Sequence, residues 1–410
     1  MKRVVITGMG VISPVGNTVA EFWSSLLAGK CGIDFITRFD ASEFKVKIAA
    51  EVKGFDAAQY MEKSEARKTD LYARYAIAAA VQAMEDSGYT VSDPGRLGVY
   101  VGSGIGGMET FMTECQKLSE KGPRWVSPHF IPMMIANIAA GSIAIRFGAQ
   151  GPCLPVVTAC ATSSHAIGEA FRAIKHGYAD AILAGGAEAV INPLSVAGFT
   201  NCMALSTRND PLDSSIPFDK RRDGFVMGEG AGILLLEEYE HAKARGAKIY
   251  AEIRGYGNTC DAYHVTAPHP ESVSAAQAIS LAMEEAGIST EDAGAVYINA
   301  HGTSTPLNDK AETLAIKTAF GAHAGKVMVS STKSMTGHML GAAGAAEAIA
   351  SIKAVQEGAI PPTIGYKEPD PECDLNIVPN VSRRADVRLA LSLSLGFGGH
   401  NACLAFARAE

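Results

Sequence analysis

Short, wholly apolar segments alternate with alanine-rich segments along this chain, and the alternation strongly limits the folds it can adopt. Apolar runs typical of strands buried on both faces occupy residues 4–7, 97–101, 181–184, 233–237, 295–299, 327–331 and 389–395. Residues 166–175 and 342–355 are apolar almost all round, which predicts two helices inside the core. The pattern predicts an α/β fold.

The same order of elements occurs twice. Residues 99–107, 158–177 and 182–189 hold a strand that ends in small residues, a turn before an Ala-rich helix, and a strand that ends in glycine. Residues 296–305, 331–358 and 391–402 repeat this order. We therefore interpret the chain as a duplicated α/β unit packed in layers. The charged stretches 60–68 and 206–222 are predicted as solvated surface.

Composition and charge exclude several classes of protein. The 410 residues are 47% hydrophobic with a net charge of −7, which favours a large core and argues against a nucleic-acid binder. The eight cysteines form no CxxC pair and the histidines show no zinc spacing, so we expect reduced thiols, a cytoplasmic location and no metal in the chemistry. Gly8, Gly10 and Pro14 interrupt the apolar start, which predicts a buried strand there and no signal peptide or membrane insertion.

Two glycine-rich segments imitate a dinucleotide-binding motif. GSGIGG at residues 102–107 follows a predicted strand, but the acidic position expected about 20 residues later falls in a polar segment without a strand. GMG at residues 8–10 is followed by Pro14, which interrupts the expected helix. We interpret both segments as tight turns beneath helices and expect no nucleotide cofactor.

Cys160 lies in VVTACATSSHAIGEA, between a β-branched apolar stretch and a helical one. This order predicts a sharp strand-to-helix turn at a helix N-terminus, where the helix dipole favours the thiolate and lowers the pKa of the thiol. Small neighbours, Ala159, Ala161 and Thr162, leave room for a substrate carbonyl. A lone cysteine is more often a buried structural residue, and we assign that role to the other cysteines.

His301 and His338 each lie in a Gly/Thr-rich loop between an apolar strand and a helix. Their separation of 37 residues fits two successive junctions that face one site. A cysteine hydrolase would need only one histidine with an Asn or Asp partner. Two imidazole N–H donors instead suit an enolate oxyanion, which forms when a malonyl carboxylate leaves as carbon dioxide. In GFGGHN (396–401), glycines around Phe397 allow a backbone N–H to approach a reacting oxygen.

Four motifs together resemble the signatures of the β-ketoacyl-acyl-carrier-protein synthases, the condensing enzymes of bacterial type II fatty-acid synthesis, and most closely their synthase II branch. They are TACATSSHA, NAHGTSTPLND, KSMTGHMLGAAGAAE and GFGGHN, and RDGFVMGEGAG and ITGMGVISPVG match as well. The resemblance implies a thiolase-like five-layered αβαβα fold from two duplicated halves, which are residues 1–250 with the nucleophile and residues 251–410 with the two histidines. It also implies a homodimer.

The resemblance also implies a role for each matching residue. Cys160 is similar to the acyl-accepting nucleophile, and His301 and His338 to the pair that drives malonyl decarboxylation. Lys333 is similar to the lysine that shapes the electrostatics of the site, with Glu347 as its partner. Backbone N–H groups of Cys160 and Phe397 match the oxyanion hole. The substrate-binding residues implied are the pantetheine-binding Thr303 and Thr305, the gatekeeper Phe397 with Phe199 beside it, and Ile105 in the acyl pocket.

The implied partner is acyl carrier protein, which carries the phosphopantetheine, so no bound cofactor is required. A basic patch that would dock this acidic partner matches Arg67, Lys68 and Arg124, with Arg208 as a further candidate. The family also admits a structural monovalent cation near the equivalents of Asn299, Glu347 and Ser392.

Two other activities remain open on these residues. A polyketide-type ketosynthase would share the same motifs, and acyl-chain length is not fixed by them. A cysteine acyl-thioester hydrolase could use Cys160 and one histidine, but it would leave His338 and Lys333 without a task. One departure from the family pattern, GPCLPVV at residues 151–157, lies upstream of Cys160 and is expected to affect packing alone.

Overall fold

One mixed sheet joins both ends of the chain in the computed structural model, which describes residues 1–409. Its strands run in the order β11-β9-β8-β13-β14-β7-β1-β6-β5-β4. Their bounds are β1 (Val4–Ile12), β4 (Leu97–Gly102), β5 (Ala181–Glu188), β6 (Gly230–Glu238), β7 (Ala251–Cys260), β8 (Val296–Asn299), β9 (Met328–Ser330), β11 (Asn376–Ile377), β13 (Leu389–Gly396) and β14 (His400–Ala407). Every strand predicted from an apolar run is present.

Strand pairing shows the duplication directly. On one side β4 is parallel to β5, and β5, β6 and β1 follow antiparallel to one another. On the other side β8 is parallel to β13, and β13, β14 and β7 follow antiparallel. Antiparallel pairing of β1 with β7 joins the two sets. The repeat seen in the sequence is therefore a repeat of topology.

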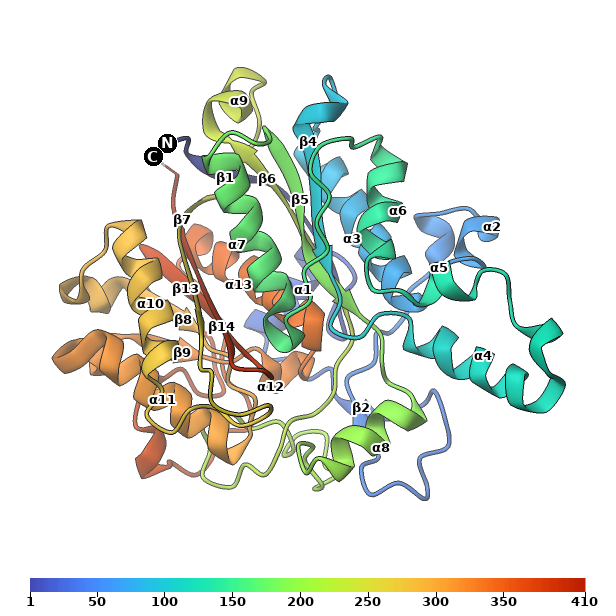
Figure 1. Ribbon diagram of the computed structural model, residues 1–410. Helices are drawn as coiled ribbons and strands as arrows, with labels where there is room; N and C mark the ends of the chain where they lie inside the picture. The colour runs from blue at the N-terminus through green and yellow to red at the C-terminus, as the bar shows by residue number, and fades with distance from the viewer. Residues whose placement is uncertain (410) are drawn as a thin grey trace.

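The helices form three layers around and between the strands. The outer helices are α3 (Leu71–Ser87), which packs on β1 and β6, and α10 (Val273–Ala286), which packs on β7 and β14. Between the two sets of strands lie α7 (Thr162–Lys175) and α13 (Ala343–Glu357), each in contact with strands of both sets. Figure 1 shows α10 on one flank, α3 on the other, and α7 and α13 between them. This is the predicted αβαβα layering.

Glycines allow the outer helices to lie directly on the strands. A Cβ at Gly10 in β1 would stand 2.0 Å from a carbonyl oxygen of α3, and one at Gly257 in β7 would stand 1.8 Å from a carbonyl oxygen of α10. Gly8 and Gly255 repeat the same close approach. The segment GMG is thus part of a strand rather than the predicted turn, although it does lie beneath a helix, and no room for a nucleotide exists there.

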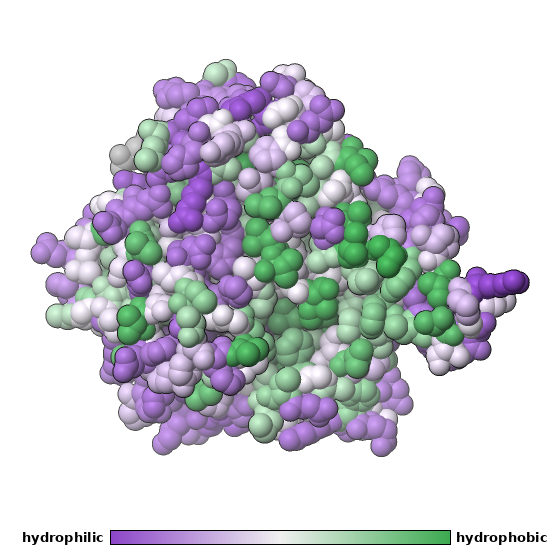
Figure 2. Space-filling view, in the orientation of Figure 1, coloured by the Kyte–Doolittle hydropathy of each residue, from purple (hydrophilic) through white to green (hydrophobic). Residues whose placement is uncertain are grey.

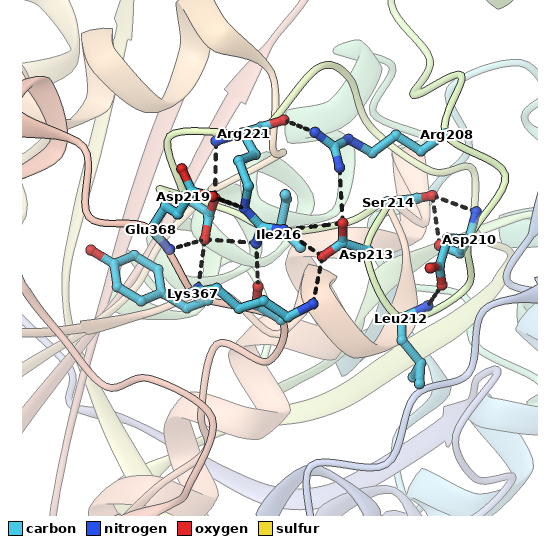
Figure 3. A network of polar contacts seen from close by, with 12 residues as sticks. Arg208, Asp210, Leu212, Asp213, Ser214, Ile216, Asp219, Arg221, Lys367 and Glu368 are labelled. Atoms are coloured by element: carbon cyan, nitrogen blue, oxygen red, sulfur yellow. Dashed lines mark hydrogen bonds and ion pairs between the residues drawn. The ribbon is translucent and has the colours of Figure 1, made fainter.

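The loop 206–222 differs from its prediction as solvated surface, because residues 214–219 are all buried. Its charged side chains pair with one another and with residues 365–370, so burial leaves them with partners (Figure 3). Within residues 1–409, no helix is both long and apolar enough to cross a membrane.

Candidate active site

A cavity of about 540 Å³ lies where the central helices begin, and it brings together residues from both sets of strands. Figure 2 shows a hollow bordered by hydrophobic residues on this face, next to α8 (Pro193–Asn201). Cys160, His301 and His338 all line the cavity. The predicted substrate-binding residues line it as well: Ile105, Phe199, Thr303, Thr305 and Phe397.

Cys160 lies on a tight turn that leads into α7. The turn is a 3₁₀ segment, Ala159–Ala161, and Ala159 adopts a left-handed φ of 50° that is strained for a residue with a side chain. Two bonds close it: Ala161 N donates to Thr158 O (3.0 Å), and Thr158 N donates to Thr162 Oγ1 (2.9 Å). The predicted turn at a helix N-terminus is confirmed, although the segment before it forms only an isolated bridge with β4.

The pKa of Cys160 differs from the expectation. Burial raises the pKa of this thiol to about 11, while the charge of Lys333 and the backbone N–H groups of Phe397 and Cys160 act in the opposite direction. Desolvation therefore outweighs these opposing contributions, and the pKa is raised, whereas the sequence predicts a lowered pKa. The same two N–H groups that the resemblance assigns to an oxyanion hole lie next to the sulfur.

The raised pKa predicts how Cys160 reacts with a small alkylating agent. We expect its rate of alkylation by iodoacetamide to keep rising up to about pH 11, because the thiolate is the nucleophile. The alkylation rate of an ordinary thiol, whose pKa is near 8.5, would instead level off about one pH unit above that value, well below pH 11. Peptide-level mass spectrometry can follow Cys160 beside the exposed Cys115 in one sample. A plateau for Cys160 below pH 9 would contradict the prediction.

His301 and His338 face each other across the cavity wall. Their ring centroids are 5.2 Å apart and the rings are nearly perpendicular, at 87°. His301 follows β8, and His338 follows the short helix α12 (Lys333–Thr336). Burial lowers the pKa of both rings well below 6.5, and the charge of Lys333 lowers it further. Both imidazoles are therefore neutral near pH 7.

Hydrogen bonding indicates which nitrogen of His338 carries the proton. Leu340 N donates to His338 Nδ1 (3.3 Å), so the hydrogen of the neutral ring resides on Nε2. His338 Nε2 and His301 Nδ1 are buried and have no hydrogen-bond partner within residues 1–409. A buried polar atom without a partner on a cavity wall is suited to bind a ligand oxygen.

Lys333 lies behind the histidine pair and is 1% exposed. Its ammonium pairs with the carboxylate of Glu347 on α13, the partner expected for it. Burial raises the pKa of Glu347, and Lys333 opposes that rise. A buried charge of this kind acts strongly on its surroundings, since little water screens it.

Sequence reasoning missed two residues that shape the site. Glu312 on α11 (Pro306–Phe320) accepts hydrogen bonds from the backbone N–H groups of His301 (2.6 Å) and Gly302 (2.7 Å). Burial raises the pKa of Glu312 to about 8. Phe225 contacts the ring of His338 edge-on, with centroids 5.2 Å apart. Phe225 lies in the motif RDGFVMGEGAG, which would have pointed to it, but nothing local marks Glu312.

The predicted docking residues lie outside the cavity. Arg67 and Lys68 follow α2 (Lys63–Ala66), and Arg124 lies in the 3₁₀ segment Pro123–Trp125; all three are exposed. Arg208 is different, because its guanidinium donates to Asp213 Oδ2 (2.8 Å) within the loop 206–222.

Comparison with known proteins shows what the chain resembles as a whole. Residues 1–242 match the family "Beta-ketoacyl synthase, N-terminal domain", and residues 250–367 match "Beta-ketoacyl synthase, C-terminal domain". The 3-oxoacyl-[acyl-carrier-protein] synthase 2 of Synechocystis sp. is 53% identical, over 99% of this chain and 98% of the relative. The protein of the same name from Staphylococcus aureus is 52% identical, over 100% of this chain and 99% of the relative.

Solved structures agree with this relationship. A beta-ketoacyl synthase from Burkholderia phymatum superposes with a TM-score of 0.92 at 37% identity, and the ishigamide ketosynthase/chain length factor with 0.93 at 38%. A type II polyketide ketosynthase solved with its acyl-carrier protein superposes with 0.91 at 36% identity. Each covers 100% of both chains.

Proposed function

Because this chain belongs to the β-ketoacyl synthase family, we propose that it condenses acyl-acyl-carrier-protein (acyl-ACP) with malonyl-ACP in fatty-acid elongation. It would act as a 3-oxoacyl-[acyl-carrier-protein] synthase of type 2. The observation that carries the proposal is the meeting of one thiol and two neutral imidazoles in a single cavity. Relatives that are 52–53% identical over essentially the full chain carry that name.

The first half-reaction loads the enzyme. The Cys160 thiol loses its proton, and its Sγ thiolate attacks the thioester carbonyl of acyl-ACP. The carbon–sulfur bond to the carrier breaks, and the carrier sulfur takes up that proton as it leaves. The N–H groups of Cys160 and Phe397 stabilise the oxyanion of the tetrahedral intermediate. Lys333 favours the thiolate by its charge, although burial still keeps the pKa of the free thiol high. Loading therefore proceeds through a small thiolate fraction.

The second half-reaction makes the new carbon–carbon bond. In malonyl-ACP the bond to the carboxylate breaks, carbon dioxide leaves, and the electron pair forms an enolate on the thioester. His338 Nε2–H and the ring of His301 stabilise the enolate oxygen, because both carry an unpartnered buried nitrogen. The enolate carbon attacks the acyl-Cys160 carbonyl, and the Cys160 thiolate leaves. The product is 3-oxoacyl-ACP, two carbons longer.

Mass spectrometry of the intact protein tests the proposal. Mixing with acyl-ACPs of several chain lengths should add one acyl mass, located on Cys160 by peptide mapping. Subsequent addition of malonyl-ACP should remove that mass and yield 3-oxoacyl-ACP and carbon dioxide. Release of free fatty acid without malonyl-ACP would instead identify a hydrolase. The acyl lengths that load would also separate fatty-acid elongation from polyketide synthesis. The type II polyketide ketosynthase is 36% identical to this chain, whereas the 3-oxoacyl-[acyl-carrier-protein] synthase 2 relatives are 52–53% identical.

We also propose acyl carrier protein as the partner, docked at Arg67, Lys68 and Arg124. Support comes from their exposure on a protein of net charge −7 and from the related ketosynthase solved with its carrier. Replacing Arg67 and Lys68 by Glu should raise KM for acyl-ACP while leaving the rate of Cys160 acylation by a small acyl-pantetheine unchanged. Equal effects on both substrates would contradict this docking surface.

A homodimer is proposed from exposed apolar side chains. Ile145 is 83% exposed and Val157 54% exposed in the isolated chain, and Figure 2 shows hydrophobic residues gathered over α5 (Phe130–Met134) and α6 (Ile138–Phe147). Ile105 lines the cavity yet is 41% exposed, so the acyl pocket is open on that side without a second subunit. A monomeric mass by sedimentation at micromolar concentration would refute the dimer.

Three buried oxygens fit the structural monovalent cation that the family admits. Asn299 Oδ1, Glu347 Oε2 and Ser392 Oγ have no hydrogen-bond partner within residues 1–409. Asn299 and Ser392 are paired on β8 and β13, and Asn299 Nδ2 reaches the backbone of Glu347. Amide, carboxylate and hydroxyl oxygens are ligands for hard cations. The bound ion would fix α13 against the strands; a melting temperature equal in potassium and tetramethylammonium chloride would argue against it.

A further inference from the structure

Residues 206–222, which we call the clamp loop, connect the two sides of the active site. The loop is flanked by the cavity-lining residues Ala204 and Asp223, and Leu205 and Phe225 form an isolated parallel bridge between its two ends. It comes from the part of the chain that carries Cys160, yet its hydrogen bonds reach residues 304–309, 333 and 365–370. Residues 214–219 are buried, and the bonds from this buried stretch go to residues 304–309, 333 and 367–368.

Two bonds from the clamp loop end on the segments that carry the decarboxylation machinery. Ser215 Oγ donates to the backbone oxygen of Lys333 (2.8 Å). Ile216 N donates to Ser304 Oγ (2.9 Å), and Gly224 N, just beyond the loop, donates to Ser304 O (3.1 Å). Ser304 has a left-handed φ of 68° and stands between the two cavity-lining threonines. Such a conformation persists only where its surroundings hold it.

Phe218 packs against the turn that follows His301. A Cβ built on Gly302 would stand 3.2 Å from the Phe218 ring, so the ring lies directly against the residue that follows His301. Phe218 N donates to Asp309 Oδ2 (2.8 Å) on α11, the helix whose Glu312 holds the backbone of His301. Phe218 itself has a left-handed φ of 66°, so the clamp loop is strained where it meets the turn.

Asp219 holds the clamp loop in this conformation. Its Oδ1 accepts from Arg221 N and Nε (both 2.9 Å), and its Oδ2 accepts from Arg221 Nη2 (3.0 Å), Lys367 N (2.6 Å) and Glu368 N (2.8 Å). Figure 3 shows Asp219 at the centre of these contacts, with Asp213 on the other side of Arg221. Burial raises the pKa of Asp219, but its donors outweigh burial and leave the pKa below its ordinary value. The side chain is therefore a carboxylate that accepts on both oxygens.

The nucleophile turn is held separately. The backbone and hydroxyl bonds that hold this turn lie within residues 158–165, at the start of α7. We propose that Asp219 is a positioning residue which, through the clamp loop, holds the His301 turn and Lys333 for malonyl-ACP decarboxylation. Acyl transfer to Cys160 does not depend on this positioning, because Lys333 acts on that thiol through its charge alone, and a displacement of about 1 Å changes such an interaction little. This inference rests on the proposed function, because it assigns one residue to one of that function's two half-reactions.

Asp219→Asn tests the inference with almost no change of volume. An amide accepts on one side only, so its NH₂ group must face either the Arg221 donors or the N–H groups of Lys367 and Glu368. The clamp loop should then loosen. We expect malonyl-ACP decarboxylation to fall by about 10- to 100-fold, the effect of displacing catalytic groups by roughly 1 Å. The rate of Cys160 acylation by acyl-ACP should stay within about twofold of the parent enzyme.

Glu237→Gln is the matched control, because Glu237 is also fully buried and held by one arginine, Arg245 (2.8 Å through both Nε and Nη2), away from the cavity. It should leave the ratio of the two half-reactions unchanged. Ser215→Ala, which removes only the bond to Lys333 O, should lower decarboxylation selectively by a few-fold and serves if Asp219→Asn does not fold.

The outcomes separate this inference from the function on which it rests. An equal loss of both half-reactions in Asp219→Asn, or no loss in either, would overturn the positioning role, and so would an unselective Ser215→Ala if Asp219→Asn does not fold. Absence of acylation or of decarboxylation in the parent enzyme would instead refute the proposed function.

Discussion

Cys160→Ala should lose elongation almost completely, by about 10⁴-fold or more, because no other group can carry the acyl chain between the two substrates. The oxyanion N–H groups and the histidine pair remain in place, so the variant should still release carbon dioxide from malonyl-ACP. Two assays on one preparation check this: product formation from acyl-ACP with malonyl-ACP, and decarboxylation of malonyl-ACP alone.

Cys403→Ala controls for the loss of a buried thiol. Cys403 lies in β14, is fully buried and does not line the cavity. Burial alone raises the pKa of its thiol, so the sulfur is inert. We expect a small loss of stability and normal elongation. Continued elongation by Cys160→Ala at the parent rate would remove Cys160 from the mechanism.

The elements that position the catalytic residues were predictable because their signals are local. Largely apolar strands such as β5 and β13 and the alanine-rich helices α7 and α13 are mostly buried, so a nearly continuous apolar run marks them. Cys160 and His301 follow from the same logic, since each occupies a junction next to such a run. The prediction of the complete αβαβα fold, by contrast, rests on the family motifs.

Strand β7 was not predicted, because its partners lie far away in the sequence. Its segment carries Glu252 and Arg254, which interrupt the apolar pattern, and glycines that serve the contact with α10. Glu252 is tolerated near the core because Arg3, which directly precedes the neighbouring strand β1, pairs with it (2.7 Å). A charged residue that is neutralised by a distant one resembles surface when only its neighbours in sequence are considered.

The same reason explains the errors at the site. The clamp loop is rich in Asp and Arg, which predicts solvent, but Asp219 and Arg221 satisfy each other inside the protein. The helix N-terminus predicts a low pKa for Cys160. Burial raises this pKa instead, and burial depends on how later segments of the chain pack around the cysteine. Glu312 was missed for a related reason, since its role lies in accepting backbone hydrogen bonds on the far side of a turn.

His338→Ala should lower malonyl-ACP decarboxylation, and with it elongation, by about 10²- to 10³-fold. This is the usual cost of removing one donor from a developing oxyanion. The structure fixes Nε2 as the donor, because Nδ1 already accepts from Leu340 N. Acylation of Cys160 needs neither nitrogen, so the acyl-enzyme should form at a nearly normal rate and accumulate. Mass spectrometry of the intact protein and carbon dioxide release measure the two effects separately.

The pH dependence gives this prediction a second check. Burial keeps the pKa of His338 and His301 well below 6.5. Protonation of these two rings should therefore not reduce decarboxylation between pH 8 and about 6.5, and the acid limb of the pH profile should lie below pH 6.5. His323→Ala, outside the cavity, should change neither the rate nor this profile. A loss in His338→Ala confined to acylation, or an acid limb centred at an ordinary histidine pKa near 6.5, would show that the imidazoles do not act as neutral donors to the enolate.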